Sequence, residues 1–284
     1  MLQRPLPNLD AWVKYLGQAN IPVLKRTARE LARLRENEEN VTGRQVAAVI
    51  LQDPLMTVRV LAYIEANRRM SQNADITTID RAVMMIGITP FFAKFEDLPL
   101  VEDKLRAQPQ GLIGLLRVIT RARQAALFAR DWAVLRHDLD IDEVVVASLL
   151  HDCAETLLWC FAPALMLGIR ERQLAEPTLR SAAAQQSVLG ISLLDLQLAL
   201  TKAWRLPELL LKLMDDHQAE HPRVRNVVFA VNLARHSANG WNDPAIPDDL
   251  AEIGKLLGLS VTALMERLRR QVDIPPAEET PPAA

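Results

Sequence analysis

The stretch from residue 140 to residue 160, DIDEVVVASLLHDCAETLLWC, limits the possible folds more than any other part of the sequence. Between Val144 and Leu150 it is apolar almost all the way round a helix. A helix without a polar face is usually buried on every side. The chain has 284 residues, half of them hydrophobic, so it is long enough to form a sizeable core around such a helix.

Two ionisable residues, His151 and Asp152, follow this apolar segment directly. Burying such a pair is costly unless each side chain finds a partner. The pair therefore either has a chemical task or is a hydrogen-bonded fixture inside the core. At the other end of the segment, Asp140 or Asp142 can cap the helix by accepting from unpaired backbone N–H groups.

The composition and the helix-start signals predict an all-α fold. Glycine is scarce, with 10 residues, and clusters of β-branched residues are few, whereas leucine, alanine, arginine and glutamate dominate. Residues suited to capping a helix N-terminus recur before apolar, helix-periodic segments. They are Thr42, Asp53 before Pro54, Thr77 with Asp80 as a capping box, Ser192 and Ser260.

Charge and cysteine usage narrow the class of protein. The formal net charge is −2 and the pI is about 6.2, which argues against a general nucleic-acid binder. The arginine-rich segment 25–35 has few aromatic neighbours, so nucleic-acid binding is a weak option. Cys153 and Cys160 form no CxxC motif, and we expect reduced, buried thiols. No secretory signal is apparent, and the apolar run 156–169 is shorter than the ~18 residues that span a bilayer. We therefore expect a cytoplasmic protein without a membrane segment.

Several segments together resemble the HDOD domain family, regulatory relatives of the HD-domain metal-dependent phosphohydrolases. They are Ile21-Pro22, LQDPLMTVRVLAYIEAN (51–67), ITTIDRAVMMIGITPF (76–91), VVVASLLHDCAETLL (144–158), LGIS (189–192) and AWRLPELLLKLMDDH (203–217). The resemblance implies a two-lobed helical bundle with an HD-like C-terminal lobe. We expect a leader at 1–20, the HDOD-like domain at 21–220 with lobes of about 21–105 and 106–220, a helical extension at 221–272, and a disordered tail at 273–284.

The resemblance also implies where a catalytic metal site would lie. A catalytic HD site binds metal through an early histidine, the His-Asp pair and a later aspartate, because a hydrolytic ion must be held by several ligands and still activate water. Here the pair is His151-Asp152. The expected early position lies near 117–121, which reads RVITR and has no histidine.

Other expected positions also differ. Leucines occupy 193 and 194, where a later histidine is expected, and the His-His end of the 203–217 segment is Asp216-His217. Two ligands are too few for a firm metal site, and an arginine nearby would repel a cation. Glu155 or Asp195 could complete a site only if the fold places them there. We predict no metal, no cofactor and no catalytic residue, with His151 and Asp152 as a ligand-binding or vestigial pair.

Two functions follow, and the first is preferred. The first is a non-catalytic bacterial signalling module that binds a partner protein or a small ligand such as a nucleotide or anion. Its extension after His221 would pack on the module or form a homodimer face. The alternative is a divergent metal-dependent phosphohydrolase acting on a nucleotide or phosphoester.

Overall fold

Helices make up the fold throughout the described part of the chain. The computed structural model describes residues 1–67, 75–176, 178–272 and 274. Within these ranges there is no strand, only an isolated bridge between Val23 and Leu100, so the all-α prediction is confirmed. The predicted disordered tail, 273–284, lies outside the described residues except for Ile274.

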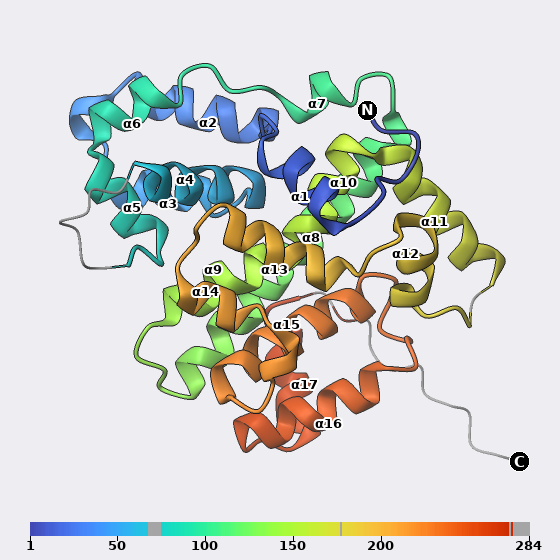
Figure 1. The fold of residues 1–284 in the computed structure, drawn as a ribbon. Helices are drawn as coiled ribbons and strands as arrows, with labels where there is room; N and C mark the ends of the chain where they lie inside the picture. Colours follow the sequence, from blue (N-terminus) through green and yellow to red (C-terminus); the bar gives the residue numbers. More distant parts are fainter. Residues whose placement is uncertain (68–74, 177, 273, 275–284) are drawn as a thin grey trace, which may run out of the picture.

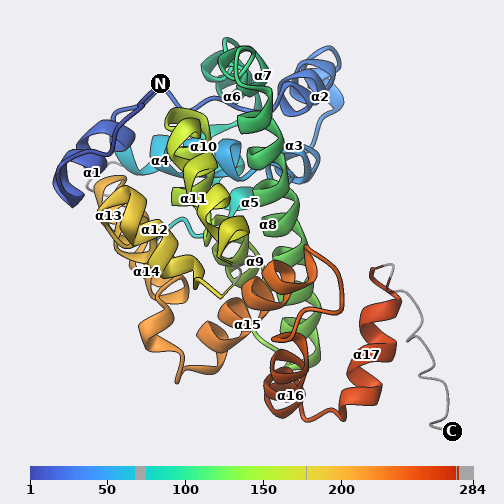
Figure 2. The same cartoon turned by 90° about the vertical axis from the view of Figure 1, so that its right-hand side faces the viewer.

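The helices of the N-terminal part gather at one end of the molecule (Figures 1 and 2). They are α2 (Lys25–Arg35), α3 (Gly43–Ile50), α4 (Pro54–Ala66), α5 (Ile79–Ile86), α6 (Ile88–Lys94) and α7 (Val101–Lys104), preceded by α1 (Leu9–Gly17), with a 3-10 turn, η1, at Glu38–Asn40. The segment before α7 is fastened to the chain before α2. The Val23 N–H donates to the carbonyl of Pro99 at 2.8 Å, and the Val101 N–H donates to the carbonyl of Val23 at 2.9 Å.

The remaining helices begin with the long α8 (Pro109–Leu135), which runs most of the height of the molecule in Figure 2. After it come α9 (Ile141–Leu150), α10 (Cys153–Phe161), α11 (Pro163–Ala175), α12 (Ser181–Leu189), α13 (Leu193–Ala203), α14 (Glu208–Leu213), the 3-10 turn η2 (Asp216–Gln218), α15 (Pro222–Ser237), α16 (Ile246–Leu257) and α17 (Val261–Arg269). α8 packs most extensively against α9 and α15. The extension after His221 therefore packs on the rest of the chain, one of the two arrangements expected for it.

Asp53 shows how a local cap also fixes tertiary structure. Its carboxylate caps α4 by accepting from the N–H groups of Leu55 at 3.0 Å and Met56 at 3.3 Å. It also accepts from the Leu24 N–H at 2.8 Å, which ties the start of α2 to α4. Burial raises the pKa of Asp53, although these N–H groups work in the opposite direction.

Two of the predicted caps are wrong. Thr77 does not form a capping box with Asp80: α5 begins after Thr78 without a side-chain cap, and the Thr77 hydroxyl donates instead to Glu143 Oε1 at 2.7 Å. Asp140 precedes α9, but its side chain makes no capping bond, and neither does Asp142, which lies inside the helix. The carbonyl of Asp140 accepts from Arg223 at 3.0 Å, and Arg223 also pairs with Glu143 at 2.9 Å. At both positions, hydrogen bonds to residues distant in the sequence form instead of the expected capping bonds.

The apolar segment 140–160 is buried as expected, and it forms two helices. It divides into α9 and α10, and His151 and Asp152 lie at the break between them. By length and composition Ile141–Phe161 could cross a membrane, yet 89% of its most apolar window is buried inside the protein. Such burial is typical of core helices, and neighbouring helices cover the apolar surfaces of α9 and α10. Trp159 of α10 packs directly over Gly114 of α8, where a side chain would not fit.

Candidate functional site

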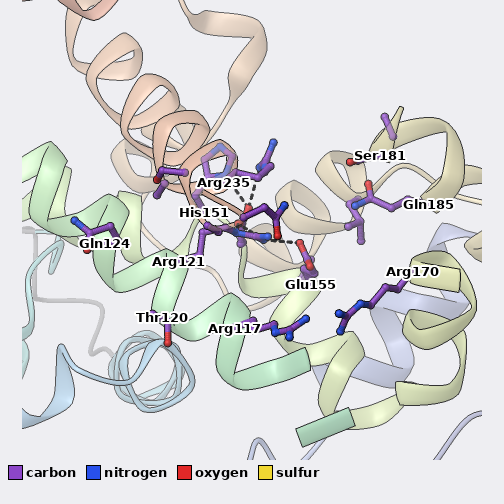
Figure 3. Close-up of a pocket in the computed structure, with 18 of the residues that line it drawn as sticks. Arg117, Thr120, Arg121, Gln124, His151, Glu155, Arg170, Ser181, Gln185 and Arg235 are labelled. Atoms are coloured by element: carbon purple, nitrogen blue, oxygen red, sulfur yellow. Dashed lines mark hydrogen bonds and ion pairs between the residues drawn. The ribbon is translucent and has the colours of Figure 1, made fainter. Parts of the chain in front are cut away.

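The break between α9 and α10 places His151 and Asp152 side by side in the interior. Their side chains are 6% and 10% exposed, so each needs partners in the protein. The partners come from α8, from the 3-10 turn after α14 and from α15, three elements that meet at this point (Figure 3). The histidine–aspartate pair is thus the centre of a cluster of charged groups.

Two arginines neutralise Asp152. Arg121 of α8 donates to Asp152 Oδ2 through Nε at 3.0 Å and through Nη2 at 2.6 Å, and the same Nη2 contacts Glu155 at 2.8 Å. Arg235 of α15 donates to Asp152 Oδ1 at 3.3 Å. Burial alone would raise the pKa of Asp152, but the charges of Arg121 and Arg235 hold that pKa well below its usual range. Asp152 is therefore a buried carboxylate whose oxygens are both occupied by guanidinium groups.

His151 lies between two carboxylates. Its Nε2 is 2.8 Å from Asp216 Oδ1, and its Nδ1 is 3.4 Å from Asp152 Oδ1. Burial on its own would lower the pKa of His151, but the hydrogen bonds to Asp152 and Asp216 outweigh burial and raise the pKa to about 9. At neutral pH the ring is therefore an imidazolium that donates from both nitrogens, and it has no lone pair for a metal ion.

The donor set does not fit the metal that the related phosphohydrolases would hold. Among the described residues, no three His, Cys, Asp or Glu side chains are grouped so that they could hold an ion. Glu155 does reach the cluster, but Arg121 occupies it. Asp195 is exposed on α13, and it does not line the cavity beside the cluster. One of the cations in contact with Asp152 is the guanidinium of Arg121, on the stretch of α8 where the resemblance implied a metal-binding histidine.

The sequence pattern predicts the central pair but not its partners. It places Arg121 in a stretch without histidine, near enough to repel a cation, and it marks Asp216 as a departure from the His-His pattern, but it predicts no bond from either residue to the pair. It gives Arg235 no role. His217, the other member of that pattern, is 73% exposed and pairs with Asp215, so it lies outside the cluster. The sequence did contain a signal for the bond between Arg121 and Asp152. An arginine stands where a histidine is expected, and it supplies the positive charge that a buried aspartate needs.

A cavity of about 1390 Å³ lies beside the cluster. One wall is α8, another is formed by α11 and α12, and a third by α15 with the loop that follows it, so the extension contributes directly. Figure 3 shows Arg117 of α8 and Arg170 of α11 pointing toward one another from two of these walls. The lining mixes polar and apolar side chains, and the cavity is open to solvent where exposed residues such as Arg117 line it.

The two cysteines are free and buried, as expected. Burial raises the pKa of Cys153 to about 12 and also raises that of Cys160. Neither thiol is therefore a thiolate near neutral pH, which excludes both as nucleophiles in the folded protein.

These helices and the His-Asp pair at the α9–α10 break are those of an HDOD-type helical fold. The HDOD domain family matches residues 21–220, and the chain belongs to this family. The resemblance found in the sequence is thus confirmed.

Solved structures agree with this fold. The MmoQ response regulator from Methylococcus capsulatus str. Bath is 17% identical, with a TM-score of 0.66 over 89% of this chain and 99% of that one. A virulence factor from Campylobacter jejuni subsp. jejuni is 16% identical, with a TM-score of 0.68 over 94% and 98% of the two chains. At these identities the likeness shows the fold alone. The search of curated proteins found no match.

Proposed function

We propose that this protein is a non-catalytic signalling module of the bacterial cytoplasm, which acts by binding a partner protein or a small ligand. The observation that carries the proposal is the occupation of Asp152 by Arg121 and Arg235, together with the hydrogen bond of His151 Nε2 to Asp216. The name of one structural relative, a response regulator, agrees with a role in signalling. The two free, buried cysteines agree with a reducing compartment.

Hydrolysis at this pair would need a different electrostatic arrangement. A hydrolytic metal needs about three protein ligands and an open position for water. To bind one, Asp152 would have to release its arginines and His151 would have to lose its proton. The freed guanidinium of Arg121 would then remain close to the ion and repel it. The alternative function, a divergent phosphohydrolase, is therefore disfavoured.

The same cluster is suited to pass the effect of ligand binding from one helix to another. It joins α8, the α9–α10 break, the turn at Asp216 and α15, so a ligand that moves one of these elements changes ion pairs in the others. Buried ion pairs have strict geometric requirements, since a charge that loses its partner in the interior is strongly destabilising. The arrangement therefore favours discrete alternative states rather than gradual adjustment.

The proposal is tested by assaying purified protein against a panel of phosphodiesters and phosphomonoesters with added Mn²⁺, Fe²⁺, Ni²⁺ or Zn²⁺. The expected result is the same background rate for the wild type and for His151→Ala. Turnover by the wild type that disappears in His151→Ala would overturn the proposal. A thermal melt of the variant should accompany the assay, so that loss of folding is not mistaken for loss of catalysis.

A further inference from the structure

We propose that the cavity beside the His151–Asp152 cluster binds a phosphate-bearing small molecule, with its phosphate group held between Arg117 and Arg170. The inference rests on the proposed function and specifies its ligand class. It starts from the charges that line the cavity. They are the arginines at 117, 121, 170 and 235 and the carboxylates of Asp152, Glu155 and Asp216, with His151 beside them.

The cavity carries an excess of positive charge. Four guanidinium groups face three carboxylates, in a protein whose overall formal charge is −2. The three carboxylates pair with only some of these cationic groups. Asp152, Glu155 and Asp216 are paired with Arg121, Arg235 and His151. Within the described ranges, neither Arg117 nor Arg170 makes a hydrogen bond or an ion pair. The two unmatched charges of the cavity are therefore these two guanidinium groups.

The wall formed by α8 adds hydrogen-bond donors to these charges. Arg117, Thr120, Arg121 and Gln124 line the cavity, and Thr120 and Arg121 each lie three or four residues from both Arg117 and Gln124, on one face of the helix. The Nε2 of Gln124 is buried and has no hydrogen-bond partner in the described part of the chain. A buried amide donor without an acceptor is destabilising, and an oxygen atom of a ligand would relieve that cost.

A phosphate group matches this set of donors. Each guanidinium can donate two parallel hydrogen bonds to oxygens of one anion, and a tetrahedral dianion has enough oxygens for two guanidinium groups at once. The pocket is also far larger than a phosphate ion. Its volume of about 1390 Å³ exceeds the roughly 300–1,000 Å³ of typical small-molecule sites, and Trp241, in the loop after α15, adds an aromatic side chain to its lining. A nucleotide therefore fits as a source of the phosphate, as does free phosphate.

The test is isothermal titration calorimetry on the full chain at about 150 mM salt, where long-range attraction is screened. The probes are AMP, inorganic phosphate and adenosine. We expect AMP or phosphate to bind and adenosine, which lacks the phosphate, not to bind. AMP binding identifies a phosphate ester as the ligand, and binding of phosphate alone identifies the free anion. Arg117→Ala and Arg170→Ala should each weaken binding at least about tenfold.

Arg123→Ala is the matched control, because Arg123 lies on the same helix but does not line the cavity. This variant should bind as the wild type does. No binding of AMP or phosphate at about 10 mM would overturn the inference. So would equal binding of adenosine and AMP, or an equal loss in Arg123→Ala. His151-dependent hydrolysis of AMP would overturn the proposed function and leave the binding site standing, so the two failures are distinguishable.

Discussion

Raising the pH through the titration of His151 should destabilise the folded protein by a defined amount. The pKa of the imidazole rises from 6.5 in the unfolded chain to about 9 in the folded protein. The folded state therefore binds more protons than the unfolded state between these values. The resulting stabilisation is present in full below about pH 6.5 and is lost as the pH rises through about 9.

The difference between the two pKa values corresponds to about 3 kcal/mol of unfolding free energy, at 1.36 kcal/mol for each pKa unit. This figure is an upper bound because the side chain of Asp216 is 42% exposed, and water screens part of its attraction for the ring. Even so, it is a large fraction of the roughly 5–15 kcal/mol that stabilises a typical domain.

The assay is urea unfolding followed by circular dichroism at intervals between pH 6 and 10, for the wild type, His151→Gln and His217→Gln. The wild type and His217→Gln should lose stability between pH 6 and 9, whereas His151→Gln should vary much less over these values. His217 is the matched control, since it lies one residue from Asp216 but is 73% exposed. The buried cysteines lower stability above about pH 9 in all three proteins, so the difference between curves isolates the imidazole. The same pH dependence in the wild type and His151→Gln would refute the reasoning.

Two substitutions test the packing and the pairing around the site. Arg121→Met should cost about 3–5 kcal/mol of unfolding free energy in urea, because the buried carboxylate of Asp152 loses its main partner, and Asp152→Asn in the same chain should recover part of that loss. A loss below about 1 kcal/mol would contradict the buried pair. Gly114→Ala should cost about 1–3 kcal/mol, because its Cβ would lie 2.4 Å from the ring of Trp159. The control Gly168→Ala, with nothing within 4 Å of its Cβ, should instead stabilise the helix, and equal losses in the two variants would contradict the close contact.

Local features of the fold could be predicted from the sequence. Thr42, Asp53, Ser192 and Ser260 cap helices as expected, because the capping bond joins residues only two or three positions apart. The prediction that the 140–160 segment is buried is also confirmed, since a helix that is apolar on all sides is stable in water only when other parts of the chain cover it.

Contacts between distant residues could not be predicted in the same way. Thr77 and Asp80 have the spacing of a capping box, but the hydroxyl of Thr77 bonds with Glu143, 66 residues further along. A local pattern cannot show that a tertiary partner will compete for the same side chain. The bond of Arg235 to Asp152, across 83 residues, was missed for this reason.

The central residues of the candidate site could be predicted, but the ion pairs that they form could not. The sequence identified His151 and Asp152 and the lack of a histidine between 117 and 121. It did not show that Arg121 of that same stretch would turn its guanidinium onto Asp152. Helical spacing gives the face on which a residue lies, but which charged group it meets depends on how the helices pack.

The metal content of the purified protein tests the central claim most directly, namely that guanidinium groups hold Asp152 in place of a metal ion. Inductively coupled plasma mass spectrometry should detect Fe, Mn, Ni and Zn far below one ion per chain, with no difference between the wild type and Asp152→Ala. A stoichiometric metal in the wild type that disappears in Asp152→Ala would contradict the account.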